Sequence, residues 1–525
     1  MRSMSAIGGG FKYLPVELFK AGQKCFVFDA GKVVFMEVDC LTFDILRLLR
    51  RENLPPKMIT ARLPQYDAAA VRQVCRELAG LRERGYLNPR KLIRASPHTQ
   101  TEFETVLSRK LSGMTVFLTT RCNLACSYCM YGGGYSEHIL PPGATMTWDT
   151  ARNALAFLNR HSGAAERIKI EFFGGEPLIA FDLLRRCVDH WKKLSGPKME
   201  RTDLVVITNG TLLRGDRLDF LMQNRFHVQV SLDGGSEVHD SARRYRGTRR
   251  GSFTDVFGNL VALHDRDPEY LRQYVHLKGV IARENLEKDD SAFWGHPVVD
   301  AIQGAGSLER IVERPHYEST DDSGYLWCLH RVGAKLLKVR GARSVEELLS
   351  TLNEKERLVF ERTFADFYSV QAANMACFRD SVEVPFLKSC LMGFQDGAVL
   401  PSGDIAVCVE ATSHVIGNVN EGRWYFDRIA EMNDRLHRDW PACSECFVGR
   451  FCRLCWQKVS GEGAAWRSAR IRFCSFTRKY YREIFGVMLR VLVRNPLLWE
   501  DLHRAVRETI QEIRKSLAGP SSQTP

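Results

Sequence analysis

RCNLACSYCMY, at residues 121–131, contains three cysteines, Cys122, Cys126 and Cys129, separated by three and then by two residues. The run GMTVFLTT just before it is apolar and β-branched, so it predicts a strand with the cysteines on the loop at its C-terminal end. Three thiolates at this spacing can hold one 4Fe–4S cluster and leave its fourth iron without a protein ligand. A zinc knuckle is the alternative, but zinc sites usually have four ligands, and the nearest further candidate is His138.

The pattern C-x3-C-x2-C, with the aromatic Tyr128 before its third cysteine, resembles the radical S-adenosylmethionine (SAM) superfamily. The resemblance implies that the open iron binds the amino and carboxylate groups of SAM. It also implies that an electron from the cluster cleaves SAM to a 5′-deoxyadenosyl radical. We therefore expect SAM and one SAM-binding 4Fe–4S cluster as cofactors, with a flavodoxin or ferredoxin as the electron donor.

Strand-like and helical segments alternate from the cysteines onward, which predicts βα units with parallel strands. The strand-like runs are TVFLTT, IKIEFFGGEP, LVVITNG, HVQVSLDG and YVHLKGVIARE. We expect an α/β fold with a partial (β/α)6 TIM-type barrel over residues 112–290, followed by a helical connecting region over residues 291–376. Folds of this kind place the active site on the loops at the C-terminal ends of the strands.

The second strand-like run ends in Gly174, Gly175, Glu176 and Pro177. Paired glycines let a backbone approach a ligand closely and leave the Glu176 carboxylate to meet an ammonium group. A tight turn alone would explain the same four residues. Beside the cysteine loop, the segment resembles the GGE motif of the superfamily, and the resemblance implies binding of the amino group of SAM.

Polar residues also follow the next two strand-like runs. Thr208 and Asn209 end the third, and Ser231 and Asp233 end the fourth. In similar proteins these positions line the SAM pocket or face its ribose or methionine moiety. Arg243 resembles an arginine that faces the SAM carboxylate, and a surface charge is the alternative for it.

The C-terminal part is rich in cysteines and contains the run C-x2-C-x5-C-x2-C, over residues 377–480 that we expect to form one domain. The cysteines singled out are Cys390, Cys408, Cys443, Cys446, Cys452, Cys455 and Cys474. Their spacing resembles the SPASM domain of radical SAM peptide maturases. The resemblance implies two auxiliary 4Fe–4S clusters, the first held by Cys390, Cys408 and Cys455 and the second by the other four. Cys377 could complete the first cluster, or a substrate thiolate could bind there; two zinc ribbons are the alternative.

Residues 11–88 contain two β-rich stretches and then two helical ones, which predicts a small winged-helix-like α+β module. The module is similar to the leader-peptide-binding domain of pyrroloquinoline quinone biosynthesis. The resemblance implies that the partner is a precursor peptide bound through its leader. The last helix of the module mixes arginine with glutamate, so it does not present a strongly basic face, and we do not expect nucleic acid as a partner.

The composition is that of a globular protein, and the length of 525 residues predicts about three domains. The formal net charge is +12. The densest basic run, residues 243–250, could contact nucleic acid, an acidic peptide or only solvent, and a solvated face is the default expectation. The start of the chain has no apolar signal-like run, and arginines interrupt the apolar stretch in the C-terminal helices expected over residues 481–515, so we expect no membrane contact. Sixteen cysteines without an export signal point to metal ligation in the cytoplasm.

These patterns favour a radical SAM peptide maturase that forms a thioether or another crosslink in a ribosomally made peptide. The closest alternative is an enzyme like the anaerobic sulfatase maturases, which make formylglycine. Those enzymes have an aspartate base directly after the cysteine that corresponds to Cys408, where this chain has Val409, and Glu410 is a candidate substitute base. A DNA-binding iron–sulfur redox regulator is the alternative from another class.

Overall fold

The structure is a computed structural model. It describes residues 16–51, 54, 56–87, 91–94, 100–129, 131, 140–281, 285–303, 308–312, 324–339, 342–361, 363, 364, 367, 370, 383–386, 393, 394, 397–437, 443, 446–452, 463–501 and 504.

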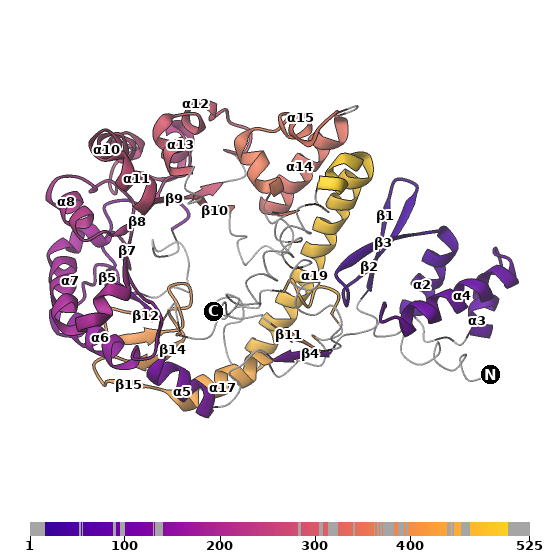
Figure 1. The fold of residues 1–525 in the computed structure, drawn as a ribbon, viewed down its shortest axis with the longest axis horizontal. Helices are drawn as coiled ribbons and strands as arrows, with labels where there is room; N and C mark the ends of the chain where they lie inside the picture. Colours follow the sequence, from indigo (N-terminus) through magenta and orange to yellow (C-terminus); the bar gives the residue numbers. More distant parts are fainter. Residues whose placement is uncertain are drawn as a thin grey trace, which may run out of the picture.

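Parallel strands that follow one another in chain order form the centre of the barrel half of the molecule, on the left in Figure 1. They are β5 (Gly113–Thr119), β6 (Ile168–Gly174), β7 (Thr202–Thr208), β8 (His227–Ser231), β9 (Val275–Ile281) and β10 (Leu308–Val312). Every neighbouring pair among the six is parallel. This arrangement confirms the predicted α/β fold with a partial (β/α)6 barrel.

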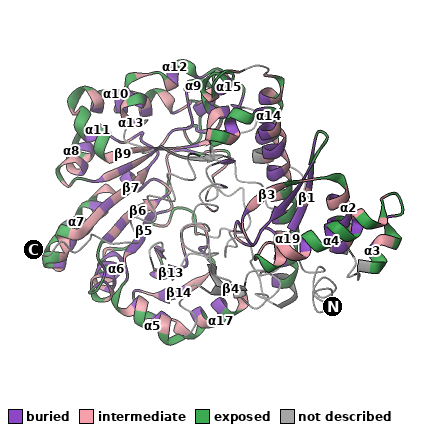
Figure 2. Cartoon of the chain, turned by 45° about the vertical axis from the view of Figure 1, so that its right-hand side comes forward, coloured by how far each residue is buried: buried purple, intermediate pink, exposed green. Residues whose placement is uncertain are grey.

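Helices and 3-10 turns between these strands provide the crossovers that parallel pairing requires. They are α6 (Trp148–His161), η2 (Pro177–Ala180), α7 (Phe181–Ser195), η3 (Gly196–Arg201), α8 (Gly215–Gln223), α9 (Ser236–Ala242), α10 (Phe253–Arg266), α11 (Pro268–Tyr274), α12 (Ser291–Trp294) and α13 (Pro297–Gln303). Their apolar side chains and one face of the strands form a single core. Figure 2 shows the buried residues concentrated in the strands and on the helix faces turned toward them.

Side-chain alternation along the strands separates this core from the concave face of the barrel. In β6, Ile170 and Phe172 are buried in the core, whereas Lys169, Glu171 and Phe173 alternate with them and are only half-buried. Since successive side chains of a strand point to opposite faces, the second set faces the inside of the barrel. The interior is therefore lined partly by polar groups, unlike a barrel filled by branched apolar side chains.

Strand β10 is the part of the barrel that the predicted boundary at residue 290 misses. Its sequence, LERIV, contains charged residues and lacks the long apolar run of the other strands. For this reason it was not recognised as a strand and was included in the region expected to be helical. The described helices of that region include α14 (Gly324–Lys338) and α15 (Val345–Leu349).

The sheet continues beyond β5 into the C-terminal part of the chain. β12 (Ala398–Val399) pairs with β5 in parallel, and β13 (Asp404–Ala406), β14 (Val415–Asn418) and β15 (Arg423–Trp424) extend it as antiparallel strands. Helices α5 (Gln100–Arg109) and α17 (Phe426–His437) pack together below this extension in Figure 1. A separate pair joins β4 (Lys91–Arg94) to β11 (Glu383–Phe386).

The N-terminal module forms an antiparallel sheet and three helices, in agreement with the predicted α+β module. Its elements are β1 (Val16–Ala21), β2 (Lys24–Asp29), β3 (Val34–Val38), α2 (Cys40–Arg51), α3 (Pro56–Arg62) and α4 (Ala68–Glu83). The buried Asp29 carboxylate accepts hydrogen bonds from the backbone N–H groups of Gly31 and Leu87, both at 2.8 Å. These bonds fix the end of the module to its β2–β3 turn, and burial raises the pKa of Asp29.

The long helix α19 (Gly463–Arg494) lies between the N-terminal sheet and the rest of the molecule (Figure 1). Phe485 of α19 is fully buried, and its ring centre lies 4.7 Å from that of Phe28 and 5.5 Å from that of Phe35. On the same side, the buried Glu17 carboxylate accepts hydrogen bonds from Arg50 and, at 3.1 Å, from Arg482 of α19. The module is therefore docked through an aromatic cluster and through an ion pair between the buried Glu17 and the partly exposed Arg482.

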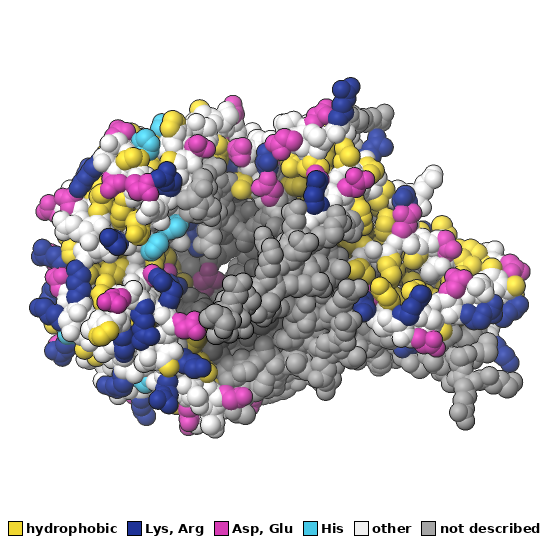
Figure 3. All heavy atoms as spheres, viewed as in Figure 1, with side chains coloured by type: hydrophobic (Ala, Val, Ile, Leu, Met, Phe, Trp, Pro, Cys, Tyr) yellow, Lys and Arg dark blue, Asp and Glu magenta, His cyan; other side chains and the backbone are white. Residues whose placement is uncertain are grey.

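Charged side chains of both signs are scattered over the barrel half of the face seen in Figure 3, so the net positive charge does not form one broad patch there. Within the described residues, every helix is too short or too polar to span a bilayer.

Replacing Phe485 with alanine should loosen the docking of the N-terminal module. We expect the unfolding transition that includes the aromatic cluster to lose about 3–5 kcal/mol, the usual cost of removing a buried phenylalanine ring. Guanidinium unfolding and hydrogen exchange of β1–β3 measure the effect. Phe476→Ala, at a half-buried site on the same helix, is the matched control and should cost less; equal unfolding curves for the two variants would contradict the docking role.

Candidate active site

Cys122, Cys126 and Cys129 lie on the loop that leaves the C-terminal end of β5, where the sequence placed them. All three are free, partly buried thiols. Burial raises the pKa of Cys122 to about 12 and also raises that of Cys126. Among the described residues, no group of three or more His, Cys, Asp or Glu side chains converges to hold a single metal ion. A 4Fe–4S cube has a different requirement, since each thiolate binds a separate iron.

The two glycines after β6 lie against the backbone of the cysteine loop. A Cβ atom on Gly174 would overlap with the Thr119 carbonyl, and one on Gly175 would overlap with the Arg121 carbonyl. The Gly175 N–H donates to the Thr119 oxygen at 2.8 Å, and the Glu176 N–H donates to the Arg121 oxygen at 2.9 Å. The sequence predicted that these glycines let the backbone approach a ligand closely. In the structure they let the end of β6 approach the strand and loop that carry the cysteines.

The Glu176 carboxylate is fully buried and faces donors of the protein. It accepts hydrogen bonds from the Leu178 N–H at 3.0 Å, the Thr208 hydroxyl at 2.8 Å and the Asn209 N–H at 2.7 Å. Burial raises its pKa to about 7, although these three donors act in the opposite direction. In this conformation the carboxylate connects the ends of β6 and β7. Binding of the SAM amino group by this segment stays a prediction.

Asn209 connects the end of β7 to the cysteine loop. Its Nδ2 donates to Asn123 Oδ1 at 2.8 Å and lies 3.7 Å from Cys122 Sγ, within hydrogen-bonding range of sulfur. The Cys122 sulfur also accepts from the Leu124 N–H at 3.4 Å. The structure thus brings Asn209 together with the first cysteine, and two N–H donors point at its sulfur. Thr208 contacts Glu176 instead.

Asp233, just beyond the end of β8, connects that strand to Tyr128 and Arg243. Asp233 Oδ2 accepts from Tyr128 Oη and, at 3.0 Å, from Arg243 Nε. Its other oxygen accepts from the Val280 N–H of β9 at 2.9 Å. Arg243 Cζ lies 5.2 Å from the centre of the Tyr128 ring. The three side chains that the sequence singled out separately therefore form one group beside the cysteine loop.

Arg243 is buried, so the surface-charge alternative for it is wrong. Burial acts to lower its pKa, but attraction to Asp233 and Tyr128 outweighs this and raises the pKa. Desolvation by burial likewise raises the pKa of Tyr128 well above its usual value. Arg243 therefore carries a permanent positive charge within the protein.

His239 is a site residue that the sequence reasoning missed, although it lies in the quoted segment HDSARR. It is fully buried; its Nδ1 accepts from the Asp233 N–H at 3.4 Å, and its Nε2 lies 2.9 Å from Ser252 Oγ. The Ser252 hydroxyl in turn donates to the Arg243 carbonyl at 3.1 Å. Burial lowers the pKa of His239 to about 4, so the imidazole is neutral and its proton belongs on Nε2.

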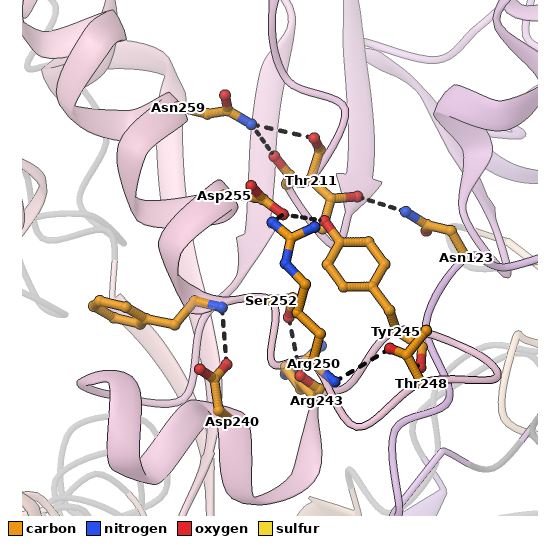
Figure 4. A network of polar contacts seen from close by, with 12 residues as sticks. Asn123, Thr211, Asp240, Arg243, Tyr245, Thr248, Arg250, Ser252, Asp255 and Asn259 are labelled. Carbon is orange, nitrogen blue, oxygen red and sulfur yellow. Dashed lines mark hydrogen bonds and ion pairs between the residues drawn. The ribbon is translucent and has the colours of Figure 1, made fainter.

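The basic run at residues 243–250 is a turn paired with the cysteine loop. Apart from the buried Arg243 and the half-buried Tyr245 its residues are exposed, as predicted for a solvated face. Leu124 and Tyr245 form an antiparallel bridge, and the Ala125 N–H donates to the Arg244 carbonyl at 2.8 Å. Arg246 Nε donates to the Cys122 carbonyl at 3.2 Å. Figure 4 shows the side-chain network around this turn, including the ion pair of Arg250 with Asp255 at 2.6 Å.

Ser231 occupies the C-terminal end of β8 and is half-buried. Its backbone partner on β9 is Lys278. Both side chains alternate with core residues of their strands, so both face the inside of the barrel. Ser231 therefore lies at the barrel mouth, on the strand that leads to Asp233.

Three cysteines of the predicted second auxiliary cluster interact with two arginines of α19. Arg470 Nη2 lies 3.4 Å from Cys443 Sγ. A hydrogen bond with Cys446 raises the pKa of Arg478, and Cys474 and Cys443 add to the effect. Cys452 is buried beside this region.

The structure describes only part of the segment predicted to hold the first auxiliary cluster. Cys390, Cys455 and Cys377 lie outside the described residues, whereas Cys408 is described and is partly buried. Tyr131, two residues after the cysteine motif, donates its hydroxyl to the Val409 carbonyl. The loop of the first three cysteines and the segment of Cys408 and Glu410 are thus in contact.

Comparison with known proteins gives matches for the part of the chain that forms the barrel. Residues 116–284 match the family model of the Radical SAM superfamily. A cysteine-type anaerobic sulfatase-maturating enzyme of Clostridium novyi is 28% identical over 163 residues, which are 31% of this chain and 42% of that protein. The radical SAM cyclopropyl synthase TigE of Paramaledivibacter caminithermalis is 22% identical over 202 residues, 37% of this chain and 39% of that protein. The chain spans less than half the length of either relative.

A solved structure of native anSMEcpe with bound AdoMet aligns with 71% of this chain and 98% of its own, at 16% identity and a TM-score of 0.47. The matched residues 116–284 include the cysteine loop, the ends of β6, β7 and β8, and the turn that holds Arg243. The family implies SAM and a 4Fe–4S cluster as cofactors. Residues 116–284 of this chain therefore form a radical SAM domain.

Proposed function

We propose that this protein is a radical SAM enzyme that modifies a ribosomally made precursor peptide or protein. The observation that carries the proposal is the cysteine loop at the barrel mouth, which the ends of three neighbouring strands hold in place. Such placement at the C-terminal ends of parallel strands is where barrel enzymes carry out their chemistry.

The residues of the loop fit a 4Fe–4S cluster. Cys122, Cys126 and Cys129 supply three soft sulfur donors on one short segment. The Leu124 N–H and the Asn209 amide point at the Cys122 sulfur, and hydrogen bonds of this kind tune the reduction potential of iron–sulfur clusters. A fourth cysteine is absent from residues 121–131, so one iron would be available to SAM.

For SAM we propose the pocket residues Gly174–Pro177, Thr208, Asn209, Ser231, Asp233 and Arg243, with Tyr128. Cluster and SAM together supply reductive cleavage of a sulfonium and hydrogen-atom abstraction from the substrate. The side chains of this chain orient the components. Glu176 fixes the relative position of the β6 and β7 ends, while Asp233 holds the Arg243 charge beside Cys126 and keeps Tyr128 against β8.

Two auxiliary 4Fe–4S clusters complete the proposal. Cys408, with Cys390 and Cys455, would hold the first, and Cys443, Cys446, Cys452 and Cys474 would hold the second. The contacts of Arg470 and Arg478 with cysteine sulfurs support the second, because guanidinium donors compensate the negative charge of thiolate ligands. The first would be completed by Cys377 or by a substrate thiolate, and the latter would favour thioether formation.

The N-terminal module would capture the leader of the precursor. Because it is docked on α19, it would raise the effective concentration of the peptide at the barrel. The relatives named for sulfatase maturation and cyclopropyl synthesis show that related domains serve different reactions. We place the enzyme in the cytoplasm, where a flavodoxin or ferredoxin would supply electrons. Mass spectrometry of candidate precursors co-expressed with the enzyme tests which bond forms.

A sulfatase-maturase-like reaction is the second candidate, favoured by the similarity to sulfatase-maturating enzymes. Val409 replaces the aspartate that those enzymes would place after Cys408, so Glu410 would have to act as the base. Glu410→Gln separates the two functions: it should abolish formylglycine formation but leave peptide crosslinking in place.

Cys126→Ala should remove the cluster of the cysteine loop. We expect 5′-deoxyadenosine formation from SAM and dithionite to fall by more than about 100-fold, because even changes behind a metal ligand cost 10–100-fold. Cys187→Ala, which alters a buried thiol in the core of α7, is the control and should keep its activity. Full turnover by the Cys126→Ala variant would refute the proposed radical SAM activity.

Gly175→Ala should disturb the cluster without touching a cysteine, since the new Cβ overlaps with the Arg121 carbonyl. We expect less iron per chain in the cysteine-loop cluster and a broadened electron paramagnetic resonance signal. Gly258→Ala in α10 is the matched control, because its Cβ meets no atom within 4 Å. Identical spectra for the two variants would show that the close approach is unimportant.

A further inference from the structure

Exposed arginines gather on the turn that holds the cysteine loop. Arg244, Arg246 and Arg249 are exposed on the turn, and Arg121 is exposed at the start of the loop. The Arg246 N–H donates to the Asn123 carbonyl at 2.9 Å, and the Ser127 N–H donates to the Ala242 carbonyl at 3.1 Å. These backbone bonds place the basic surface directly over the segment between Cys122 and Cys126.

Within the described part of the chain, the partners of these side chains are backbone carbonyls, which leave the positive charge uncompensated. Arg244 Nε donates to the Asp240 carbonyl at 2.9 Å, and Arg246 donates to the carbonyls of Cys122 and Leu124. Carbonyl groups orient a guanidinium but carry no net charge. Arg250 differs, because it forms an ion pair with Asp255. The surface therefore presents positive charge beside the proposed cluster.

The same contacts distinguish between two anionic partners. A nucleic-acid site commonly adds aromatic faces on which bases stack. Tyr245, the aromatic residue of the turn, has Arg250 Cζ over its ring at 5.0 Å, and its hydroxyl donates to Asp255. That ring is therefore already covered on one side and fixed at its tip. Four exposed arginines on the cysteine loop and its paired turn, next to the proposed cluster, fit an acidic protein better.

We propose that this arginine surface, made of Arg121, Arg244, Arg246 and Arg249, is the docking site of an acidic one-electron donor protein. The inference rests on the proposed function, because it requires the cluster. One electron leaves the reduced donor and enters the oxidised cluster, so the donor is oxidised by one electron and no bond changes. Charge complementarity would mainly accelerate the encounter.

The test reverses two charges that make no contact with the cysteines. Arg244→Glu with Arg249→Glu is compared with Lys192→Glu and Lys193→Glu, an equal charge change on exposed residues of α7. Because α7 connects the parallel strands β6 and β7, it runs back along the barrel, and its C-terminal end lies near the N-terminal ends of the strands, away from the cysteine loop. Both proteins are reconstituted anaerobically, and their iron content is measured first.

Reduction of the cluster by an acidic flavodoxin hydroquinone is followed by stopped-flow bleaching, together with the dissociation constant of the pair. At low salt we expect the arginine variant to lose at least about tenfold in the bimolecular rate constant and to bind more weakly, while the lysine variant matches the wild type. The difference should vanish at high salt. Reduction by the small cation of reduced methyl viologen should be equal in all three proteins.

Three results would overturn the inference: equal flavodoxin rates for both variants, equal loss in both, or loss of affinity for a DNA or RNA oligonucleotide with unchanged flavodoxin kinetics. Absence of bleaching by methyl viologen would instead overturn the proposed function itself, since no reducible cluster would be present.

Discussion

The cysteine loop at residues 121–129 forms neither a helix nor a strand, so its shape depends on hydrogen bonds from its neighbours. The end of β6 approaches it through two glycines, the end of β7 reaches it through Asn209, and the turn after α9 pairs with its backbone. Each such bond contributes only about 0.5–1.5 kcal/mol net. Their number, and the fact that they come from separate strands, is what holds the three thiols in place.

Buried charge is the second element of this arrangement. The end of β8 lies between two buried ion pairs: Asp233 with Arg243 on one side, and Asp290 with Lys355, at 3.4 Å, on the other. Asp290 also accepts from the Gly235 N–H at 3.0 Å. Buried pairs pay a desolvation penalty that often cancels their attraction, so stability alone does not explain them. They fix the β8 loop from both sides, and Lys355 shows that the connecting region takes part in shaping the site.

The fold and the identity of the loop could be predicted because their signals are local. Cysteine spacing and the alternation of apolar strands with amphipathic helices are visible within short windows of sequence. The pairing of the cysteine loop with residues 242–251 joins segments more than a hundred positions apart, and no local pattern announces it. For the same reason the contact of the arginine run with the cysteine loop was not predicted, and His239 was overlooked.

Glu176 shows a different limit of sequence reasoning. A motif names the residue types that a site needs, but it does not say which atoms face the ligand and which face the scaffold. Here three protein donors surround the carboxylate, and the glycines serve the close packing of two backbones. Strand β10 was missed because its charged residues disguise a short strand at the edge of the parallel array.

The most direct test of the central claim is Mössbauer spectroscopy of the anaerobically purified, ⁵⁷Fe-labelled protein before and after addition of SAM. The account predicts a 4Fe–4S spectrum in which one iron site changes its isomer shift when SAM binds. A protein that contains zinc in place of iron, or iron sites that do not respond to SAM, would contradict it.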